Sequence, residues 1–531
     1  MSRVLNFFKY MLVAFLCAAG ISCNELPEAP EYDLPEEDVQ QPQPENDEFV
    51  ILFTNDFHSQ IEPLGQEETY NAGRGGIKRI KALVDSVRAA EPYVLLADAG
   101  DMVQGTYYFS LLNGVVEMMI LDELGYDVRT LGNHEFDKKM VGLGDMLSFS
   151  DVPVVATNYD FSNTALADRV LTSVMVDAGA LKIGFVGLNI RLLNLVDPTA
   201  YEGVEWQDAV NVADDEALRL RQQGADMVIA LSHLGYYRDS DRWYYDRGIA
   251  MNTRYIDMII GGHTHTFLNK ADYVKSLDGD MVPIVQTGSR GICLGYAKVK
   301  LDDKGKPSFT YRLIPVDASM DKRIDKTFSD RIDAYSASVT EKMNEVIGYC
   351  PQTLRKGNPE SPLGNLTADG LVWMARHFFG FDADVSLYNS GGIRAEISKG
   401  NLTLGDVYAA YPFDNVLSMV TLKGRDLKTL FEHMAEEGGM PVNKGVKLVI
   451  DGNRVKSVTV NGKSVEDDKV YNVATIDYLV NTGRYGLDKI LNRTDSAEMV
   501  RDYFGEYFRY LAAQNPEGHI TASADGRIVI E

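Results

Sequence analysis

Between residues 49 and 318, short apolar runs alternate with longer stretches of helical periodicity. Each apolar run has the length of one buried strand, and together they span Phe49–Phe53, Tyr93–Leu96, Val128–Leu131, Met227–Leu231 and Met258–Ile260. Between them, the spacing of apolar residues predicts helices such as Ile77–Ala89 and Val115–Leu124. Strands that alternate with helices in this order are typical of a layered α/β domain.

This first domain is predicted to end in a hairpin, followed by a long helix. Tyr296–Leu301 and Ser308–Ile314 have the pattern of strands, and the Asp-Asp-Lys-Gly sequence between them is typical of a turn. From 319 to 347, apolar residues recur at helical spacing, which predicts a linker helix. The hinge between two domains is therefore expected in or just after that helix.

A second domain is expected from 348 to 531. The chain of 531 residues is too long for one hydrophobic core, so at least two domains are required. The second part has its own strand-like runs, and Asp451-Gly452-Asn453 predicts a tight hairpin turn. We expect an α+β domain here.

The N-terminus has the features of an export signal. Arg3 and Lys9 precede an apolar run that is too short to span a bilayer, which predicts a signal peptide over residues 1–23. The run ends in Gly-Ile-Ser-Cys, which resembles a bacterial lipobox and implies lipidation of Cys23. The alternative is an ordinary secretory signal cleaved near Ser22, and both interpretations predict export.

Residues 24–48 contain no Lys or Arg and are rich in acidic residues and proline. Such a segment cannot bury enough apolar surface to fold, so we expect a disordered tether. Acidic residues directly after a lipidated cysteine resemble the surface-export signal of Bacteroidetes-type lipoproteins. We therefore expect a lipid anchor in the outer membrane and exposure at the cell surface, with the periplasmic face as the alternative.

The formal net charge of −25 argues against a nucleic-acid partner, because phosphate backbones are bound by clustered Lys and Arg. A metal-dependent nuclease is disfavoured for the same reason. A small phosphate ester stays possible as a partner, since metals or local arginines can reverse the field within a cleft. Besides Cys23, the mature chain contains only Cys293 and Cys350, which we expect to be unpaired thiols.

Each of the five predicted strands is followed by a cluster of polar residues. The clusters are Asn55-Asp56-Phe57-His58, Gly100-Asp101, Asn133-His134, Ser232-His233 and Gly261-Gly262-His263-Thr264-His265. All five histidines of the first domain lie in these clusters. The carboxyl ends of strands are where open α/β sheets build their sites. The pattern therefore predicts a shared metal site.

The ligand types in these clusters limit the metals that could bind. Imidazole, carboxylate and carboxamide groups without thiolate favour Zn, Mn, Fe or Co. Asp56-x-His58 and His263-x-His265 each offer two ligands, and Asp101 could bridge two ions. Asp98 is a nearby competitor for the bridging role, but it precedes the Gly turn, so we expect it to support the site without binding metal. Two ions about 3.5–4 Å apart would polarise a phosphoryl oxygen and generate hydroxide at neutral pH.

The order of these motifs resembles that of calcineurin-like metallophosphoesterases: Asp-x-His, Gly-Asp, Gly-Asn-His-Glu, a single His, then Gly-His-x-His. The longer forms Gly100–Thr106 and Gly132–Asp137 resemble the bacterial and animal 5′-nucleotidase family in particular. The resemblance runs from residue 51 to 486. It implies a layered α/β/β/α metallophosphoesterase domain, followed by a C-terminal 5′-nucleotidase substrate-binding domain.

The resemblance also implies a role for each polar residue. One ion would be held by Asp56, His58, Asp101 and His265, and the second by Asp101, Asn133, His233 and His263. His134 would stabilise the phosphoryl transition state, oriented by Asp137. The attacking group would be a metal-bound hydroxide, so no side-chain nucleophile is needed, and the sequence contains no Gly-x-Ser-x-Gly motif.

Two stretches of the second domain resemble the family's substrate-binding loops. Tyr388–Arg394 contains Asn389 and Arg394, of which the arginine would meet the phosphate side of a nucleotide. Tyr411–Asn415 contains Phe413 and Asn415, and the phenylalanine would stack on the base, with a place in the core as its alternative. Arg355 is a candidate for a second phosphate-facing arginine, or a solvated surface charge.

The last substrate motif departs from the family pattern. The family usually has a stacking aromatic residue followed by Asn-Gly-Gly-Asp-Gly, whose aspartate meets the ribose hydroxyls. This chain has Tyr478 and then Asn-Thr-Gly-Arg-Tyr-Gly, so that Arg484 replaces the carboxylate. Tyr478 can still stack on a base. An arginine there favours an additional phosphate or another acidic group on the substrate.

These features predict an exported two-metal phosphoesterase that hydrolyses nucleotides in the manner of a 5′-nucleotidase. The alternatives on the same site are a 2′,3′-cyclic nucleotide phosphodiesterase or a nucleotide-sugar hydrolase. The alternative from another class is a surface-anchored nucleotide-binding protein without turnover. A complete ligand set together with His134 and Asp137 favours an enzyme.

Overall fold

The computed structural model describes residues 47–65, 71–193, 195–196, 198–237 and 244–531. The predicted signal peptide, Cys23 and nearly all of the predicted tether lie outside these residues. Within the described part of the chain, none of the helices combines the length and the apolar composition needed to cross a bilayer.

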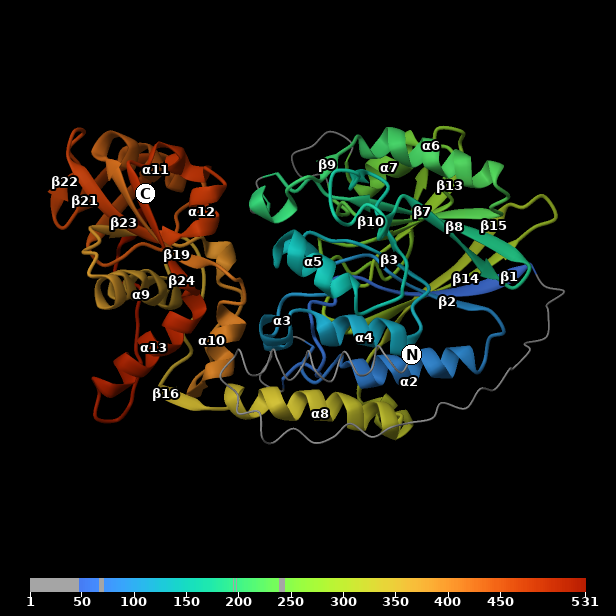
Figure 1. The fold of residues 1–531 in the computed structure, drawn as a ribbon, viewed down its shortest axis with the longest axis horizontal. Coiled ribbons are helices and arrows are strands. Elements are labelled where there is room, and N and C mark those ends of the chain that lie inside the picture. The colour runs from blue at the N-terminus through green and yellow to red at the C-terminus, as the bar shows by residue number, and fades with distance from the viewer. Residues whose placement is uncertain (1–46, 66–70, 194, 197, 238–243) are drawn as a thin grey trace. The chain divides into compact units, whose positions relative to one another are not determined.

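The N-terminal domain is built on two β-sheets that pack face to face (Figure 1). The first has seven strands in the order β15-β14-β1-β2-β3-β4-β6, and the second has six in the order β12-β13-β11-β10-β8-β7. The first sheet contains β1 (Glu48–Thr54), β2 (Val94–Asp98), β3 (Val128–Thr130), β4 (Val154–Val155), β6 (Val170–Leu171), β14 (Cys293–Leu301) and β15 (Pro307–Pro315). The second contains β7 (Ser173–Ala178), β8 (Leu181–Asn189), β10 (Met227–His233), β11 (Met258–Gly261), β12 (Asp272–Lys275) and β13 (Met281–Val285).

The core of this domain lies between the sheets. Phe53 of the first sheet and Phe185 and Ile229 of the second belong to one cluster of buried side chains. The helices are α2 (Ile77–Arg88), α3 (Tyr107–Leu112), α4 (Val115–Leu124), α5 (Lys139–Leu147), α6 (Ala209–Gln222) and α7 (Asp246–Asn252). α2 and α4 lie on the outer side of the first sheet, whereas α6 and α7 pack on the second through a separate apolar cluster (Figure 1). The domain is therefore the layered α/β/β/α sandwich expected from the sequence.

Strand register brings the predicted polar clusters to the same edge of the sandwich. β1, β2 and β3 are parallel neighbours in the first sheet, and β10 and β11 are parallel neighbours in the second. Parallel strands place their carboxyl ends at one edge, where the chain can leave the sheet. Asp56, Asp101, Asn133, His233 and His263 all lie at or just beyond these strand ends. The fold therefore gathers residues that are far apart in the sequence.

The joint between the domains differs from the predicted single helix over 319–347. A short 3₁₀ helix covers Ala318–Arg323, and α8 (Lys326–Met343) begins only after a break at which the chain is extended. The side chain of Asp325 accepts the Phe328 N–H at 2.7 Å and caps α8, which explains the new start. The apolar residues Val346 and Ile347 belong to the strand β16, so the predicted helical stripe ran across two elements.

The C-terminal domain is α+β. Its strands form two four-stranded sheets, β17-β23-β19-β24 and β22-β21-β20-β25, and the pair β16-β18. The strands are β16 (Val346–Cys350), β17 (Val385–Ser386), β18 (Gly400–Thr403), β19 (Val416–Lys423), β20 (Val446–Asp451), β21 (Arg454–Val460), β22 (Lys463–Ser464), β23 (Val470–Ile476), β24 (Asn492–Met499) and β25 (Ile528–Ile530). The helices are α9 (Pro362–Phe379), α10 (Leu404–Ala410), α11 (Gly424–Glu436), α12 (Asp477–Asn481) and α13 (Val500–Ala513).

Both predicted hairpins are present. β14 and β15 pair in antiparallel register from Cys293–Pro315 to Leu301–Pro307. β20 and β21 pair around the Asp-Gly-Asn turn, with Asp451 opposite Arg454. The two cysteines, Cys293 and Cys350, are buried free thiols, as the sequence analysis expected.

Candidate active site

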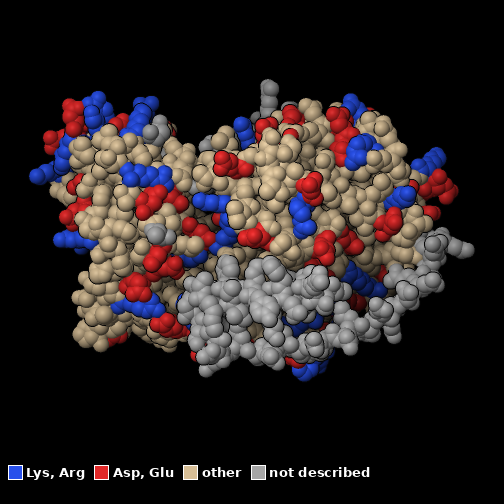
Figure 2. Space-filling view, viewed as in Figure 1, with Lys and Arg blue, Asp and Glu red and all other residues tan. Residues whose placement is uncertain are grey.

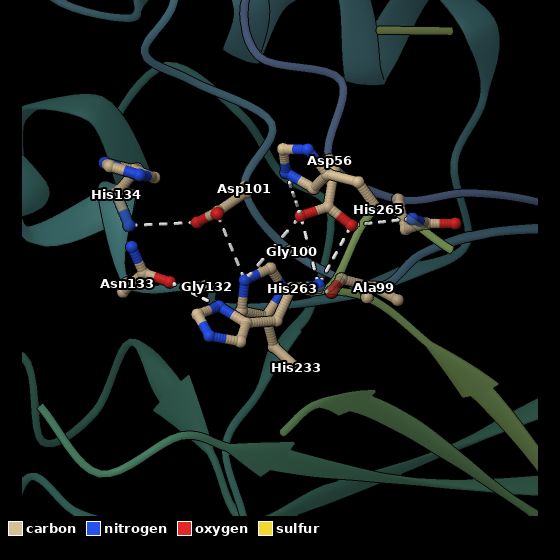
Figure 3. Close-up of polar contacts among 12 residues, drawn as sticks. Asp56, Ala99, Gly100, Asp101, Gly132, Asn133, His134, His233, His263 and His265 are labelled. Carbon is tan, nitrogen blue, oxygen red and sulfur yellow. Dashed lines mark hydrogen bonds and ion pairs between the residues drawn. The ribbon is translucent and has the colours of Figure 1, made fainter. Parts of the chain in front are cut away.

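Two groups of side chains at the strand ends are arranged as metal sites (Figure 3). The first consists of Asp56, His58 and His265, and the second of Asp101, His233 and His263. Within each group, the potential ligand atoms all lie within 4.8 Å of one another. Each group contains three of the four residues predicted to hold one of two ions.

The backbone at these residues is held in an uncommon conformation. The φ angles are 49° at Asp56, 53° at His58, 54° at Asp101, 68° at His263 and 51° at His265. A positive φ is unfavourable for residues with a Cβ and persists only where the surrounding structure fixes it. Five such residues gathered in one place indicate a site that is organised for ligation at some cost in stability.

Two glycines allow the turns that carry these residues to approach each other closely. A Cβ on Gly132 would lie 2.1 Å from Oδ1 of Asp101. Gly100 has a φ of 89°, and a Cβ there would lie 2.7 Å from the Gly132 amide nitrogen. Both positions therefore require glycine, because any side chain would push the Gly-Asp turn away from the Gly-Asn-His turn.

Glu135 joins the same two turns. One of its carboxylate oxygens accepts N–H groups from Gly132 at 2.5 Å and Asp101 at 3.2 Å, and the other accepts the Met102 N–H at 3.0 Å. The side chain is fully buried. Glu135 lies in the Gly132–Asp137 motif but had no predicted role. Its position shows that it fixes the backbone beside two predicted ligands.

The imidazole rings are oriented by main-chain carbonyls. Nδ1 of His58 lies 3.1 Å from the Gln104 carbonyl oxygen, and Nδ1 of His233 lies 2.8 Å from that of Ala99. These bonds place the proton on Nδ1 and turn Nε2 towards the centre of the site. Burial lowers the pKa of His58 to about 3 and that of His263 to about 4, so both rings are neutral near pH 7. Neutral imidazoles are the form that binds metal.

Asp101 is a member of the second group and also approaches the first. Its Oδ2 atom is 3.1 Å from Nε2 of His233 and 4.0 Å from Nε2 of His58. Burial acts against protonation of His233, but Asp101 and Asp56 raise its pKa to about 10. A field that attracts a proton so strongly also attracts a divalent cation. The donor set of carboxylates, imidazoles and one carboxamide therefore fits two hard or borderline cations.

Asn133 and Asp98 lie where the sequence analysis placed them. Oδ1 of Asn133 is 3.0 Å from Nδ1 of His263, which brings the carboxamide to the second group. Asp98 belongs to neither group. Its oxygens accept the Thr54 hydroxyl at 2.7 Å and the Gly100 N–H at 2.9 Å, so it supports the turn that leads to Asp101.

His134 stands beside the metal groups without joining them (Figure 3). Its Nδ1 atom lies 2.9 Å from Oδ2 of Asp137, and its backbone N–H donates to Oδ1 of Asp101 at 2.9 Å. Burial disfavours the charged ring, yet Asp137 and Asp101 raise the pKa of His134 above its ordinary value. The ring is therefore held as a hydrogen-bond donor directed at the adjacent cavity.

A cavity of about 440 Å³ adjoins these residues. Asn133, His134 and Asp137 line it from the N-terminal domain. Five residues predicted to bind substrate line it from the C-terminal domain, namely Asn389, Arg394, Phe413, Asn415 and Tyr478. The cavity thus brings the predicted catalytic and substrate residues together within one compact unit of the chain.

Phe413 faces this cavity and is only partly buried. Its ring centroid lies 5.8 Å from that of His134, and the guanidinium carbon of Arg394 lies 5.8 Å from the Phe413 ring. The alternative that Phe413 is a plain core residue is therefore wrong. The cavity has an aromatic wall next to a cationic group.

The two remaining predicted arginines differ in outcome. Arg355 is not among the residues that line the cavity; its side chain is 75% exposed and lies 4.0 Å from Glu396. The alternative interpretation of Arg355, a solvated surface charge in the loop before α9, is the one that agrees with this exposure. The side chain of Arg484 lies outside the described part of the structure, so its predicted role stays a prediction.

Several cavity residues had no role in the sequence analysis. They are Lys139, Asn358, Asp414, Glu437, Met440, Asp477 and Tyr485. Asp414 and Tyr485 lie within quoted motifs and Lys139 lies two residues after one, which was the only available signal for them. The others lie in loops or, for Asp477, at the start of α12, and their place in the cavity depends on the folding of the second domain.

The two-sheet sandwich and its paired Asp/His groups define a metallophosphoesterase, carried here by a two-domain chain. Residues 49–267 match the family model for calcineurin-like phosphoesterases, and residues 341–490 match that for the C-terminal domain of 5′-nucleotidases. The chain belongs to the 5′-nucleotidase family, and it is a 5′-nucleotidase-like metallophosphoesterase hydrolase.

Similar proteins cover nearly the whole chain. The 5′-nucleotidase of Mus musculus is 31% identical over 90% of this chain and 91% of its own. A 5′-nucleotidase precursor from Thermus thermophilus has a TM-score of 0.79 at 28% identity, over 91% of this chain and 99% of its own. A sulfate thiohydrolase from the same species shares the fold, with a TM-score of 0.66 at 18% identity over 94% and 98% of the chains.

Proposed function

We propose that this protein hydrolyses nucleoside 5′-monophosphates or related nucleotides with the help of two divalent cations. The observation that carries the proposal is one cavity lined by His134 and Asp137 on one side and by Phe413 and Tyr478 on the other. A phosphate placed at the metal groups would leave the nucleoside facing the aromatic wall. Similar proteins named as 5′-nucleotidases support the same substrate class.

The residues that line the cavity would have separate roles in this hydrolysis. When bound, two cations would polarise the phosphoryl group and supply a nucleophile from water. His134 would donate a hydrogen bond to a phosphoryl oxygen as negative charge develops there, and Asp137 would keep its ring oriented. Arg394 would balance the substrate's charge, while Phe413 and Tyr478 would hold the base by stacking.

A phosphate-release screen in the presence of Zn²⁺, Mn²⁺ or Co²⁺ tests this proposal. Nucleoside 5′-monophosphates should release phosphate faster than sugar phosphates, 2′,3′-cyclic nucleotides or nucleotide sugars, because only they match both the metal groups and the aromatic wall. The enzyme stripped with a chelator is the control. Faster release from a cyclic nucleotide or a nucleotide sugar would replace the proposed substrate, and release from none would refute it.

We further propose that Arg484 shifts the preference towards nucleotides with additional phosphate, since the family's aspartate is replaced there. The same screen, extended to nucleoside di- and triphosphates and run on Arg484→Asp, tests this preference separately from the main proposal. The variant should release phosphate from monophosphates faster, relative to di- and triphosphates, than the wild type does. Unchanged selectivity would show that Arg484 does not act in the cavity.

We infer that the protein is exported and lipid-anchored at Cys23, with its folded domains at the cell surface. The charged start, the short apolar run, the lipobox-like Gly-Ile-Ser-Cys and the acidic segment after it support this inference. Protease added to intact cells should therefore degrade the protein, whereas a periplasmic marker enzyme stays intact. Protection of the protein until the outer membrane is permeabilised would place it on the periplasmic face.

A further inference from the structure

The turn that carries His134 also carries a buried lysine that reaches across to the second domain. Lys138 directly follows Asp137, and its ammonium forms an ion pair with Oδ2 of Asp414. The two side chains are only 9% and 17% exposed. Lys138 belongs to the N-terminal domain and Asp414 to the C-terminal domain, so this pair links the two walls of the cavity.

Asp414 is held by a second cation from its own domain. The guanidinium of Arg501 lies 2.5 Å from Oδ1 of Asp414, and the Arg501 side chain is 3% exposed. Arg501 also donates to the Pro412 carbonyl oxygen at 3.0 Å. The segment 412–414 is therefore held by Arg501 from its own domain and by Lys138 from the N-terminal domain.

The surroundings of Lys138 make its partner important. The ammonium lies 5.1 Å from the centroid of the Phe109 ring, on the short helix α3. Burial lowers the pKa of Lys138, and the Asp414 carboxylate opposes that effect. The next residue on α3, Ser110, donates to the Pro412 carbonyl at 3.4 Å. Buried charges persist only when they are paired, so the lysine and the segment 412–414 fix each other.

Phe413 lies between the two tethered residues of this segment, and its ring is the one that faces His134. We propose that the Lys138–Asp414 ion pair positions Phe413 opposite His134 and so shapes the binding site for the nucleoside part of the substrate. Neither member belongs to the two metal groups, and Lys138 is not among the residues that line the cavity. The inference rests on the proposed function, because it assigns the ion pair to the recognition of the substrate's organic part.

Lys138→Met is the variant of choice. It removes the charge but keeps the length of the stem, and it leaves Asp414 neutralised by Arg501. Asp414→Ala would instead remove the carboxylate that two buried cations share and could prevent folding. Lys138→Arg restores the charge. Lys298→Met is the matched control, since Lys298 on β14 forms ion pairs with Glu48 and Glu91 and is not among the residues that line the cavity.

The decisive comparison uses adenosine 5′-monophosphate and p-nitrophenyl phosphate, an ester without a nucleoside. Lys138→Met should raise KM for the nucleotide about tenfold, with kcat for either substrate and KM for the small ester within about twofold of the wild type. Lys138→Arg should recover most of the loss, and Lys298→Met should change nothing. Equal losses on both substrates, or no loss on the nucleotide, would overturn the inference.

A wild-type protein without turnover would refute the proposed function and not this inference. In that case the same variants are compared by isothermal titration calorimetry with adenosine 5′-monophosphate in the presence of Mn²⁺. The expected result is again a weakening of about tenfold in Lys138→Met and recovery in Lys138→Arg. Equal affinity of Lys138→Met and the wild type would overturn the inference.

Discussion

Replacing His134 with alanine should lower kcat about a hundred- to a thousandfold while both metal equivalents stay bound. The imidazole belongs to neither metal group, and its bond to Asp137 directs it at the cavity. The contact between the backbone N–H of residue 134 and Asp101 does not depend on the side chain, so the ligand geometry should survive. Steady-state kinetics and metal analysis of the same preparation measure the two effects separately.

A surface histidine provides the matched control for this experiment. The ring of His377 is stacked on Trp373 on α9, with centroids 4.6 Å apart, and His377→Ala should leave both kcat and metal content unchanged. If His134→Ala lost metal in proportion to activity, the residue would be a ligand and its proposed role on the phosphoryl group would be wrong.

Most of the N-terminal domain could be predicted because its strands are buried on both faces and its turns follow them directly. The helix α4 matches its predicted bounds, and β14 and β15 form the predicted hairpin. The failure at residues 319–347 has a local cause. Apolar spacing continues through Ile324 and Val346, yet Asp325 caps a new helix and Val346 begins a strand. Periodicity alone does not reveal such breaks.

The metal groups were predictable because each ligand sits in a short motif at a strand end, and parallel strands bring such ends together. The wall of the cavity that the C-terminal domain forms was less predictable. Lys138 and Asp414 lie 276 positions apart, and neither flanking sequence signals an ion pair. The left-handed backbone at five predicted ligands also has no clear sequence signature, because all five are aspartates or histidines and none is a glycine, the residue that most readily adopts a positive φ.

The strong negative charge of the chain is compatible with an anionic substrate. On the face shown in Figure 2, acidic and basic side chains are interspersed, and no basic patch gathers among the described residues there. Inside the cavity, Lys139 and Arg394 join His134, whose pKa is raised despite its burial. These cations lie beside four carboxylates of the same cavity, Asp137, Asp414, Glu437 and Asp477, so metal ions at the two groups would supply most of the attraction for a small phosphate ester.

Asp101→Asn should lower kcat at least about a thousandfold and reduce the bound metal from two equivalents per chain to one or fewer. The substitution preserves shape but removes a charge of the second group that also approaches the first, 3.1 Å from His233 and 4.0 Å from His58. Metal analysis after dialysis measures the loss. Added Mn²⁺ should also raise Tm less than it does in the wild type, because a ligand stabilises only the state that binds it.

Asp98→Asn is the sharpest control, since Asp98 lies three residues earlier and is equally buried. Burial raises the pKa of Asp98 to about 7, whereas the pKa of Asp101 is, despite its burial, lowered by its histidine neighbours, so a neutral amide removes less charge at position 98 than at position 101 near neutral pH. The amide oxygen can accept the Gly100 N–H, and the NH2 group can donate to the hydroxyl oxygen of Thr54. Asp98→Asn should therefore retain both metals and most activity. The opposite result, with metal lost from Asp98→Asn and kept in Asp101→Asn, would transfer the bridging role from Asp101 to Asp98.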